Sequence, residues 1–205
     1  GKPRHGGGIA GRTEATGRGI EEVIREFFRN KEEVKKAKLN ENLKDNRIVI
    51  QGFGNVGRHL AYELYNRDNA KIIAIGEYNG ILYNEKGIDI NKLIECVLFK
   101  KTIENNELGK FIKNPKEIVE VECDILVPAA LEGVINKDNV EKVKTKLIVE
   151  AANGPIDPAS DKILFNKGVT VLPDIYVNAG GVVVSYFEWV KNLSHIRFGR
   201  MEKRY

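Results

Sequence analysis

The sequence predicts an α/β fold built on an open, mostly parallel sheet with helices on both faces. Short apolar runs rich in β-branched residues alternate along the chain with segments whose apolar residues recur at helical spacing. A glycine-rich turn stands between the first of these runs and the helical segment that follows it. Such alternation is typical of parallel strands that helices cover on both sides.

The expected elements follow one another with short connections. Ile20, Ile24 and Phe28 fall on one face of an expected helix over 16–38. The turn signal Asn79-Gly80 separates two expected strands, and Pro128 ends another. Strands are expected over 47–51, 71–76, 81–83, 124–128, 147–150 and 169–172, and further helices over 56–65, 88–101, 136–143, 158–167 and 180–193.

Composition fits a single domain over 1–205 and excludes several classes of function. The net charge is +4, and acidic residues interrupt nearly every run of Lys and Arg, so we expect no nucleic-acid partner. No apolar run approaches the roughly 20 residues of a membrane span. The three histidines are scattered, which predicts no metal site. Cys96 and Cys123 lie in apolar surroundings, and we expect buried, reduced thiols.

The motif Gly52-Phe53-Gly54-Asn55-Val56-Gly57 predicts a dinucleotide-binding, Rossmann-like domain. It directly follows an expected strand and opens an expected helix, which makes it more specific than the glycine spacing alone. Gly52 permits the tight turn, Gly54 keeps side-chain atoms away from a pyrophosphate, and Gly57 lets helix and strand pack closely. The start of the helix then offers N–H groups to the phosphates.

Glu77 supports the same interpretation and bears on the choice of coenzyme. It ends the second strand, 20 positions after Gly57, where a carboxylate can accept hydrogen bonds from the adenosine ribose. A carboxylate repels a 2′-phosphate, and residues 78–85 contain no arginine or lysine that could offset this repulsion. We therefore expect NAD as the coenzyme, while use of NADP stays open because a neighbouring loop could supply a cation.

Small or polar residues follow three later strands. They are Ala129-Ala130, Asn153-Gly154 and the segment 178–181. Ligands of open α/β sheets bind outside the carboxyl ends of the strands, and asparagine amides can hold a carboxamide or an amino-acid head group. Each asparagine taken alone is also a common turn residue.

Four segments, taken together, resemble the glutamate dehydrogenases. They are 7–19, 51–57, 151–155 and 178–192, in the order of that family and over essentially the whole chain. The closing segment 192–200 is most similar to the hexameric animal-type enzymes. A long antenna and a returning C-terminal helix follow in that branch. Neither is matched here, so the resemblance implies a fragment of a longer polypeptide.

The resemblance implies roles for individual residues. Asn153 would lie near the reacting carbon of the substrate, and Arg12 and Ser185 would reach the side-chain carboxylate of glutamate. The alternative for Ser185 is a hydroxyl bonded to its own preceding helical turn. The implied coenzyme contacts are Thr16, Gly52, Phe53, Gly54, Asn55, Val56, Gly57, Glu77, Ala130 and Asn178.

The implied reaction is the oxidative deamination of L-glutamate to 2-oxoglutarate and ammonia by hydride transfer. The family's catalytic lysine and its partner aspartate belong to an upstream substrate domain that this chain does not match, so no catalytic residue is expected here. The resemblance further implies a homo-hexamer and the mitochondrial matrix, with the cytoplasm as an alternative. Two other readings stay open: a non-catalytic nucleotide-binding or scaffold protein, and a leucine or phenylalanine dehydrogenase. Arg12 and Ser185 argue against the latter, because an apolar substrate would leave them unpaired.

Overall fold

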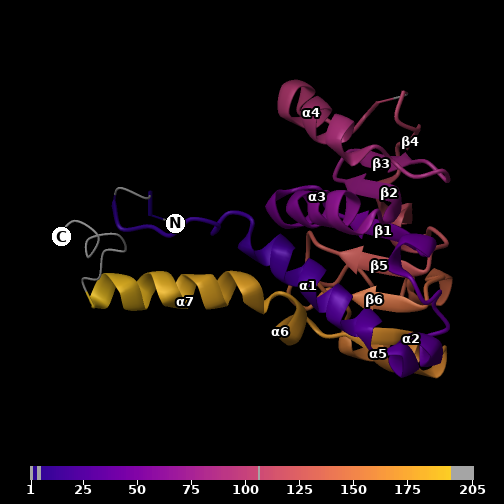
Figure 1. Ribbon diagram of the computed structural model, residues 1–205. Helices are drawn as coiled ribbons and strands as arrows, with labels where there is room; N and C mark the ends of the chain where they lie inside the picture. Colours follow the sequence, from indigo (N-terminus) through magenta and orange to yellow (C-terminus); the bar gives the residue numbers. More distant parts are fainter. Residues whose placement is uncertain (1, 4–5, 106, 195–205) are drawn as a thin grey trace.

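The computed structural model describes residues 2–3, 6–105 and 107–194, which form one α/β domain around a seven-stranded sheet (Figure 1). Most of the closing segment 192–200, together with His5 and His195, lies outside the described residues. The strands are β1 Arg47–Gln51, β2 Lys71–Glu77, β3 Gly80–Tyr83, β4 Lys110–Ile112, β5 Ile125–Pro128, β6 Leu147–Val149 and β7 Thr170–Leu172. The helices are α1 Ala15–Arg29, α2 Lys31–Lys36, α3 Asn55–Asp68, α4 Ile90–Lys100, α5 Pro158–Asn166, α6 Asp174–Val177 and α7 Ala179–Leu193, with the 3-10 helices η2 Leu43–Asp45, η3 Pro115–Glu120 and η4 Val140–Lys142.

The sheet has the strand order β4-β3-β2-β1-β5-β6-β7. The five strands from β2 to β7 in this order pair in parallel, whereas β3 and β4 add an antiparallel edge beside β2. The parallel part and the fold class are therefore as predicted. Because β1 and β5 are neighbours that run in the same direction, the ligand-binding loops after both strands meet at one edge of the sheet.

Side chains of the central strand alternate between two apolar clusters, one on each face of the sheet. Ile48 and Ile50 join the cluster that α1, α3 and α4 cover, whereas Val49 joins the cluster that η3, η4 and α5 cover. All three side chains are fully buried. The expectation of cover on both faces is confirmed, although the second face carries one α-helix and two 3-10 helices.

Two expected helices differ from the structure, and asparagine side chains explain both. The helix expected over 16–38 divides at Asn30, whose side chain accepts a hydrogen bond from the Glu33 N–H at 3.3 Å and so starts a second helix. The helix expected over 136–143 was wrong, since only the three residues of η4 are helical. There Asn139 accepts from the Asn136 N–H at 2.9 Å and donates to the Val134 carbonyl at 2.8 Å, in place of helical bonds.

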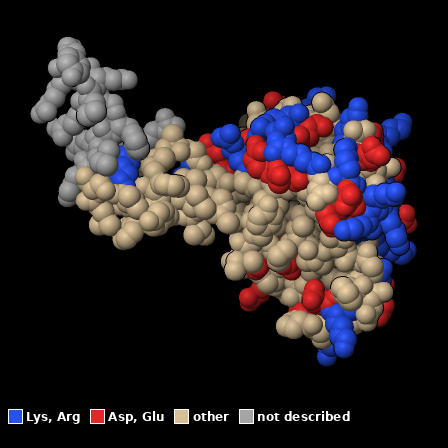
Figure 2. All heavy atoms as spheres, turned by 60° about the horizontal axis from the view of Figure 1, so that its bottom comes forward, with Lys and Arg blue, Asp and Glu red and all other residues tan. Residues whose placement is uncertain are grey.

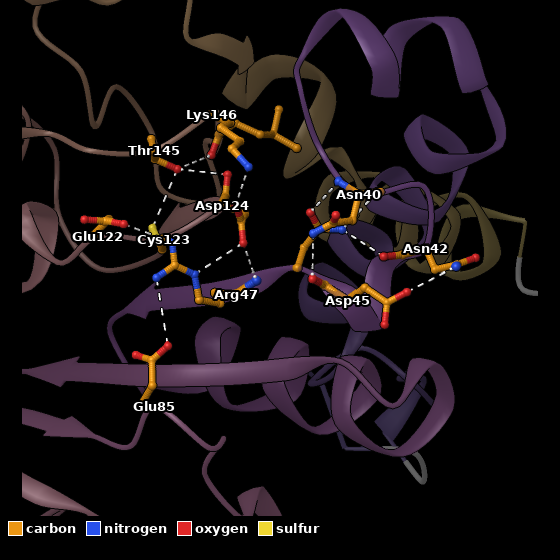
Figure 3. A network of polar contacts seen from close by, with 12 residues as sticks. Asn40, Asn42, Asp45, Arg47, Glu85, Glu122, Cys123, Asp124, Thr145 and Lys146 are labelled. Carbon is orange, nitrogen blue, oxygen red and sulfur yellow. Dashed lines mark hydrogen bonds and ion pairs between the residues drawn. The ribbon is translucent and has the colours of Figure 1, made fainter.

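A polar network closes the amino edge of the sheet, at the opposite ends of the strands from the glycine-rich turn (Figure 3). Asp124 lies at its centre, and its carboxylate accepts from the Arg47 N–H at 2.8 Å and from the Lys146 ammonium at 2.7 Å. Burial alone would raise the pKa of Asp124, but these two donors outweigh it and the pKa is lowered. Next to it, burial raises the pKa of Cys123 to about 12, so the thiol stays protonated at neutral pH. Both cysteines are free and buried, as predicted.

A second charged group lies between α1 and α3. The Glu21 side chain is completely buried and pairs with Arg67 at 3.0 Å and with Arg25 at 3.3 Å. Burial and the neighbouring Asp68 carboxylate raise the pKa of Glu21 to about 7. One oxygen of Asp68 is buried without a hydrogen-bond partner among the described residues. The charge of the Glu21 carboxyl group therefore changes near neutral pH.

Helix α7 projects from the body of the domain, and its burial pattern is the reverse of an ordinary surface helix (Figure 1). Its one buried residue is Glu188, whereas Val182, Tyr186, Phe187 and Trp189 are exposed. The projecting part shows mostly uncharged residues on the face seen in Figure 2. The N-terminal segment returns along this helix, where the Ile9 N–H donates to the Glu188 carboxylate at 3.1 Å.

Candidate functional site

The glycine-rich turn connects β1 to α3 at the carboxyl edge of the sheet, and two of its glycines are required by the fold itself. Gly52 has a φ of +99°, in the region that favours glycine, and a β-carbon there would come within 2.8 Å of the Ala130 β-carbon. A β-carbon on Gly57 would collide with the Gly52 carbonyl oxygen. The first turn of α3 therefore packs against the turn through backbone atoms alone, as the sequence predicted.

Gly54 differs from the other two glycines, because nothing in the fold requires a glycine at this position. Its φ of −72° is one that residues with a side chain also adopt. A β-carbon on Gly54 would meet no atom within 4 Å among the described residues. The exposed backbone at the start of α3 is therefore open to a close approach from outside, which fits a pyrophosphate held by helix N–H groups.

Glu77 at the end of β2 lies against this turn. Its carboxylate accepts a hydrogen bond from the Phe53 N–H, and the Gly52 N–H donates to the Gly76 carbonyl at 2.7 Å. These two bonds fix the turn to the neighbouring strand. The second carboxylate oxygen of Glu77 has no hydrogen bond within the described part of the chain, so it can accept from a ribose hydroxyl.

A cavity of about 780 Å³ opens beside Glu77 and has the size of a small-molecule site. It lies between the residues that follow β2 and those that follow β5. Ala130 lines it, and its N–H donates to the Gln51 side chain at 3.3 Å. The residues that line it are Gln51, Gly52, Gly76, Glu77, Tyr78, Asn114, Pro115, Lys116, Ile118, Val119, Glu120, Ala130, Leu131, Val134, Asn136, Asp138, Asn139 and Lys142.

The first two residues of α3, Asn55 and Val56, lie between Gly54 and Gly57 and fasten the turn to helix α1. The Asn55 amide donates to the Thr13 carbonyl at 2.7 Å, just ahead of α1. Val56 is half-buried and packs on the apolar core, and a β-carbon on Gly17 of α1 would lie 3.0 Å from its carbonyl oxygen. Helix α1 is thereby held against the start of α3 at backbone distance.

The same helix holds the far end of the candidate site in place. Thr16 contacts Gly181 so closely that a β-carbon there would overlap the threonine hydroxyl. Asn178, which precedes α7, donates its amide to the Asn153 side chain at 2.7 Å. The structure thus joins Asn153 to Asn178, and it places Thr16 against Gly181, three residues further along the chain.

Arg12 and Ser185 are engaged by the chain itself. Arg12 forms an ion pair with Glu188, which is only 6% exposed. The pKa of Glu188 is lowered by the Ile9 N–H and the Arg12 guanidinium, against the effect of burial. The Ser185 hydroxyl donates to the Gly181 carbonyl at 2.7 Å, which is the helical alternative considered for it above.

Sequence reasoning missed Glu188, the partner of Arg12. A visible signal was a single carboxylate within the apolar run 182–190, since such a group needs a partner when it is buried. Lys116 was also missed, because the 3-10 helix that carries it has no periodic apolar pattern. Within the described ranges, no cluster of three or more His, Cys, Asp or Glu side chains is arranged to hold a metal ion. No helix in those ranges has the length and apolar character to cross a membrane.

Comparisons with known proteins agree on one family. The family described as Glutamate/Leucine/Phenylalanine/Valine dehydrogenase matches residues 7–204. Among curated proteins, the mitochondrial glutamate dehydrogenase of Dictyostelium discoideum is 49% identical over the whole chain, which covers 41% of that protein. An NADP-specific glutamate dehydrogenase of Saccharolobus shibatae is 44% identical over 95% of the chain and is covered to 44% of its length. The chain therefore spans less than half the length of these relatives.

Solved structures show the same likeness. The hetero-hexameric glutamate dehydrogenase of Thermus thermophilus, in its leucine-bound form, superposes on 98% of the chain with a TM-score of 0.82 and 29% identity, and 45% of that protein is covered. The glutamate dehydrogenase of Peptoniphilus asaccharolyticus superposes on 97% of the chain with a TM-score of 0.74 and 37% identity, with 44% of that protein covered.

Proposed function

Because the chain belongs to the glutamate/leucine/phenylalanine/valine dehydrogenase family, we propose that it is the coenzyme-binding domain of a glutamate dehydrogenase. The reaction of the whole enzyme is the oxidative deamination of L-glutamate to 2-oxoglutarate and ammonia, with hydride transfer to NAD or NADP. The names of the curated relatives support this choice of substrate.

The turn after β1 carries the proposal. Gly54 serves no need of the fold itself, and the neighbouring turn backbone is fixed by the Glu77 carboxylate. A turn held this way presents N–H groups that need no rearrangement when phosphate oxygens arrive. We assign the pyrophosphate to residues 52–57, the adenosine ribose to Glu77 and the wall of the coenzyme cleft to Ala130.

The nicotinamide end of the coenzyme belongs to Thr16 and Asn178. The Asn178 amide donates to Asn153, so its own carbonyl oxygen faces away from that bond and is available to accept from a carboxamide. Asn153 then lies between the coenzyme and the substrate, which is where a residue near the reacting carbon must be. When bound, the coenzyme supplies the hydride acceptor, and these residues orient it.

Glutamate recognition is compatible with the present contact of Arg12 and requires a change in the contact of Ser185. A guanidinium has five N–H donors, so Arg12 can bind a substrate carboxylate while it keeps Glu188. Ser185 must rotate its hydroxyl away from the Gly181 carbonyl to reach a substrate. The contacts of Arg12 with Glu188 and of Ser185 with Gly181 also support a second candidate. It is a dehydrogenase of apolar amino acids, in which both residues keep these partners.

The groups that move protons in the reaction lie outside these 205 residues in this proposal. We assign no catalytic residue to the chain, and place the lysine that activates water in the rest of a longer enzyme. The greater length of the curated relatives supports this division. An oligomer is proposed from the hetero-hexameric Thermus structure, and the proposal that its subunits are identical rests on the sequence resemblance alone. The mitochondrial matrix is proposed from the name of the Dictyostelium relative, and the cytoplasm stays the alternative.

Calorimetric titration of the 205-residue chain with NAD tests the proposal. We expect measurable binding, and no formation of NADH when glutamate is added. Absence of binding at millimolar NAD by a folded chain would remove the coenzyme role and favour a scaffold protein. Steady NADH production by the purified chain would show that its own residues complete the active site, contrary to the division proposed here.

A further inference from the structure

A lysine of the 3-10 helix η3 lines the coenzyme cavity. Lys116 belongs to η3, and its side chain is exposed at the cavity that also contains Glu77 and Tyr78. Residues 78–85, which directly follow Glu77, contain no lysine or arginine. The cation therefore comes from a segment almost 40 residues further along the chain, between β4 and β5.

Glycine at position 76 brings this segment next to Glu77. A β-carbon on Gly76 would lie 2.7 Å from the side chain of Ile118, so η3 rests directly on the backbone at the end of β2. Ile118 is 3% exposed and anchors the 3-10 helix in the core of the second face. Asn114 caps the same helix by accepting from the Lys116 N–H at 3.2 Å. The backbone of Lys116 is thus held in place, while its side chain stays free to move.

The charges around the cavity leave the Lys116 ammonium uncommitted. Lys142 also lines the cavity, but its ammonium lies 3.1 Å from the Glu120 carboxylate. No hydrogen bond or ion pair engages the Lys116 side chain within the described residues. Glu77 has one carboxylate oxygen bound to the Phe53 N–H. Among the described residues that line the cavity, Lys116 is therefore a cation without a partner, and it shares the cavity with the carboxylates of Glu77, Glu120 and Asp138.

We infer that Lys116 binds the 2′-phosphate of an adenosine ribose, so that the site accepts NADP as well as NAD. The inference rests on the proposed coenzyme role. The ribose diol of NAD is recognised by the free oxygen of Glu77 and needs no cation. The 2′-phosphate of NADP carries nearly two negative charges at neutral pH and is repelled by Glu77. An ammonium on a long, flexible side chain offsets that repulsion without a fixed geometry.

The test compares both coenzymes on the complete 205-residue chain by calorimetric titration. In K116M, the Kd for NADP should rise about tenfold or more, as expected for loss of a hydrogen bond between charged groups, while the Kd for NAD stays within about twofold. K116R should retain most of the NADP affinity. K113M is the matched control: Lys113 is an exposed lysine of the same loop that does not line the cavity, and its loss should leave both Kd values unchanged.

The outcomes separate this inference from the proposed function. A folded wild-type chain that binds neither coenzyme overturns the proposed function. Binding of NAD without NADP, with the proposed function intact, overturns the role of Lys116. Equal weakening of NAD and NADP by K116M also overturns it, since Lys116 would then contact a part that both coenzymes share. If K113M weakened NADP binding as much as K116M does, the effect would come from the overall positive charge of the surface, and the specific role of Lys116 would be overturned.

Discussion

Alanine at Gly54 and alanine at Gly57 should separate ligand binding from folding, although the two residues are three positions apart in the same turn. The added methyl group at position 54 meets no atom within 4 Å among the described residues. Alanine restricts the unfolded chain, which stabilises by about 0.4–1 kcal/mol, but it is a poorer N-cap than glycine by a similar amount. We therefore expect G54A to unfold within about 1 kcal/mol of the wild type.

At position 57 the methyl group cannot be accommodated without movement. It would collide with the Gly52 carbonyl oxygen, and it would lie 3.0 Å from the Gly52 carbonyl carbon and 3.4 Å from the Ile50 side chain. Alanine normally favours a helix over glycine by about 1 kcal/mol. Overpacking against backbone costs about 1–3 kcal/mol and often more. Since backbone atoms cannot rotate away, G57A should lower the melting temperature by about 5 °C.

Thermal unfolding measures the stability of both variants, and calorimetric titration with NAD on the same preparations measures their coenzyme binding. G54A should melt like the wild type and lose NAD affinity by about tenfold or more, because the methyl group occupies the approach to the helix N–H groups. G57A should have a lower melting temperature than the wild type. If G54A binds NAD as the wild type does, the pyrophosphate does not lie on this turn and the reasoning from Gly54 is refuted. If G54A melts as early as G57A, the turn is packed more tightly than described.

Three further predictions concern charged and polar groups. D124N should lower the free energy of unfolding by about 1–3 kcal/mol near pH 7, because it removes the charge that holds the Lys146 ammonium. The lowered pKa of Asp124 makes this contribution present above about pH 3.9 and lost as pH falls through the folded-state pKa, so urea unfolding of the two proteins should converge in acid. Glu21, whose pKa is raised from 4.5 to about 7, contributes stability below pH 4.5 that is lost as pH rises through 7. The unfolding free energy of E21Q should therefore fall less than that of the wild type between pH 5 and 8, and parallel pH profiles would contradict the buried position of this carboxyl group. In the complete enzyme, S185A should raise the KM for glutamate about tenfold and leave that for norvaline nearly unchanged. Equal effects on both substrates would leave Ser185 as a helix residue bonded to Gly181.

The parallel strands and the glycine-rich turn could be predicted because their signals are local. The run 47–51 is β-branched and apolar, and the glycines follow it directly, so strand, turn and helix are specified within about a dozen positions. The expected strand over 47–51 has the bounds of β1, and the expected final helix over 180–193 begins one residue late. Strong periodicity over a short stretch leaves little room for other structures.

The contacts of the candidate site could not be predicted, because they join distant segments. Arg12 and Glu188 are separated by 176 positions, and the sequence around each residue gives no signal that the two side chains form a pair. The antiparallel edge strand β4 was missed for a related reason: the three residues 110–112 have too short a pattern to indicate a strand, and pairing with β3 stabilises it. The helix expected over 136–143 was wrong because the side-chain hydrogen bonds of its asparagines outweigh its apolar spacing.

Helix α1 approaches each of its two neighbours at one glycine, where no side chain of α1 separates the helices. Gly17 touches the backbone of α3, and Gly19 lies against Gly180 at the start of α7, where a β-carbon would come within 3.1 Å. Glycine has no rotamers to lose, so these contacts form without a side-chain entropy cost. They also cannot be repacked, because backbone has no alternative arrangement to adopt. At these two points α1 acts as a spacer, because its distance from α3 and from α7 is set there by the van der Waals radii of the main chain.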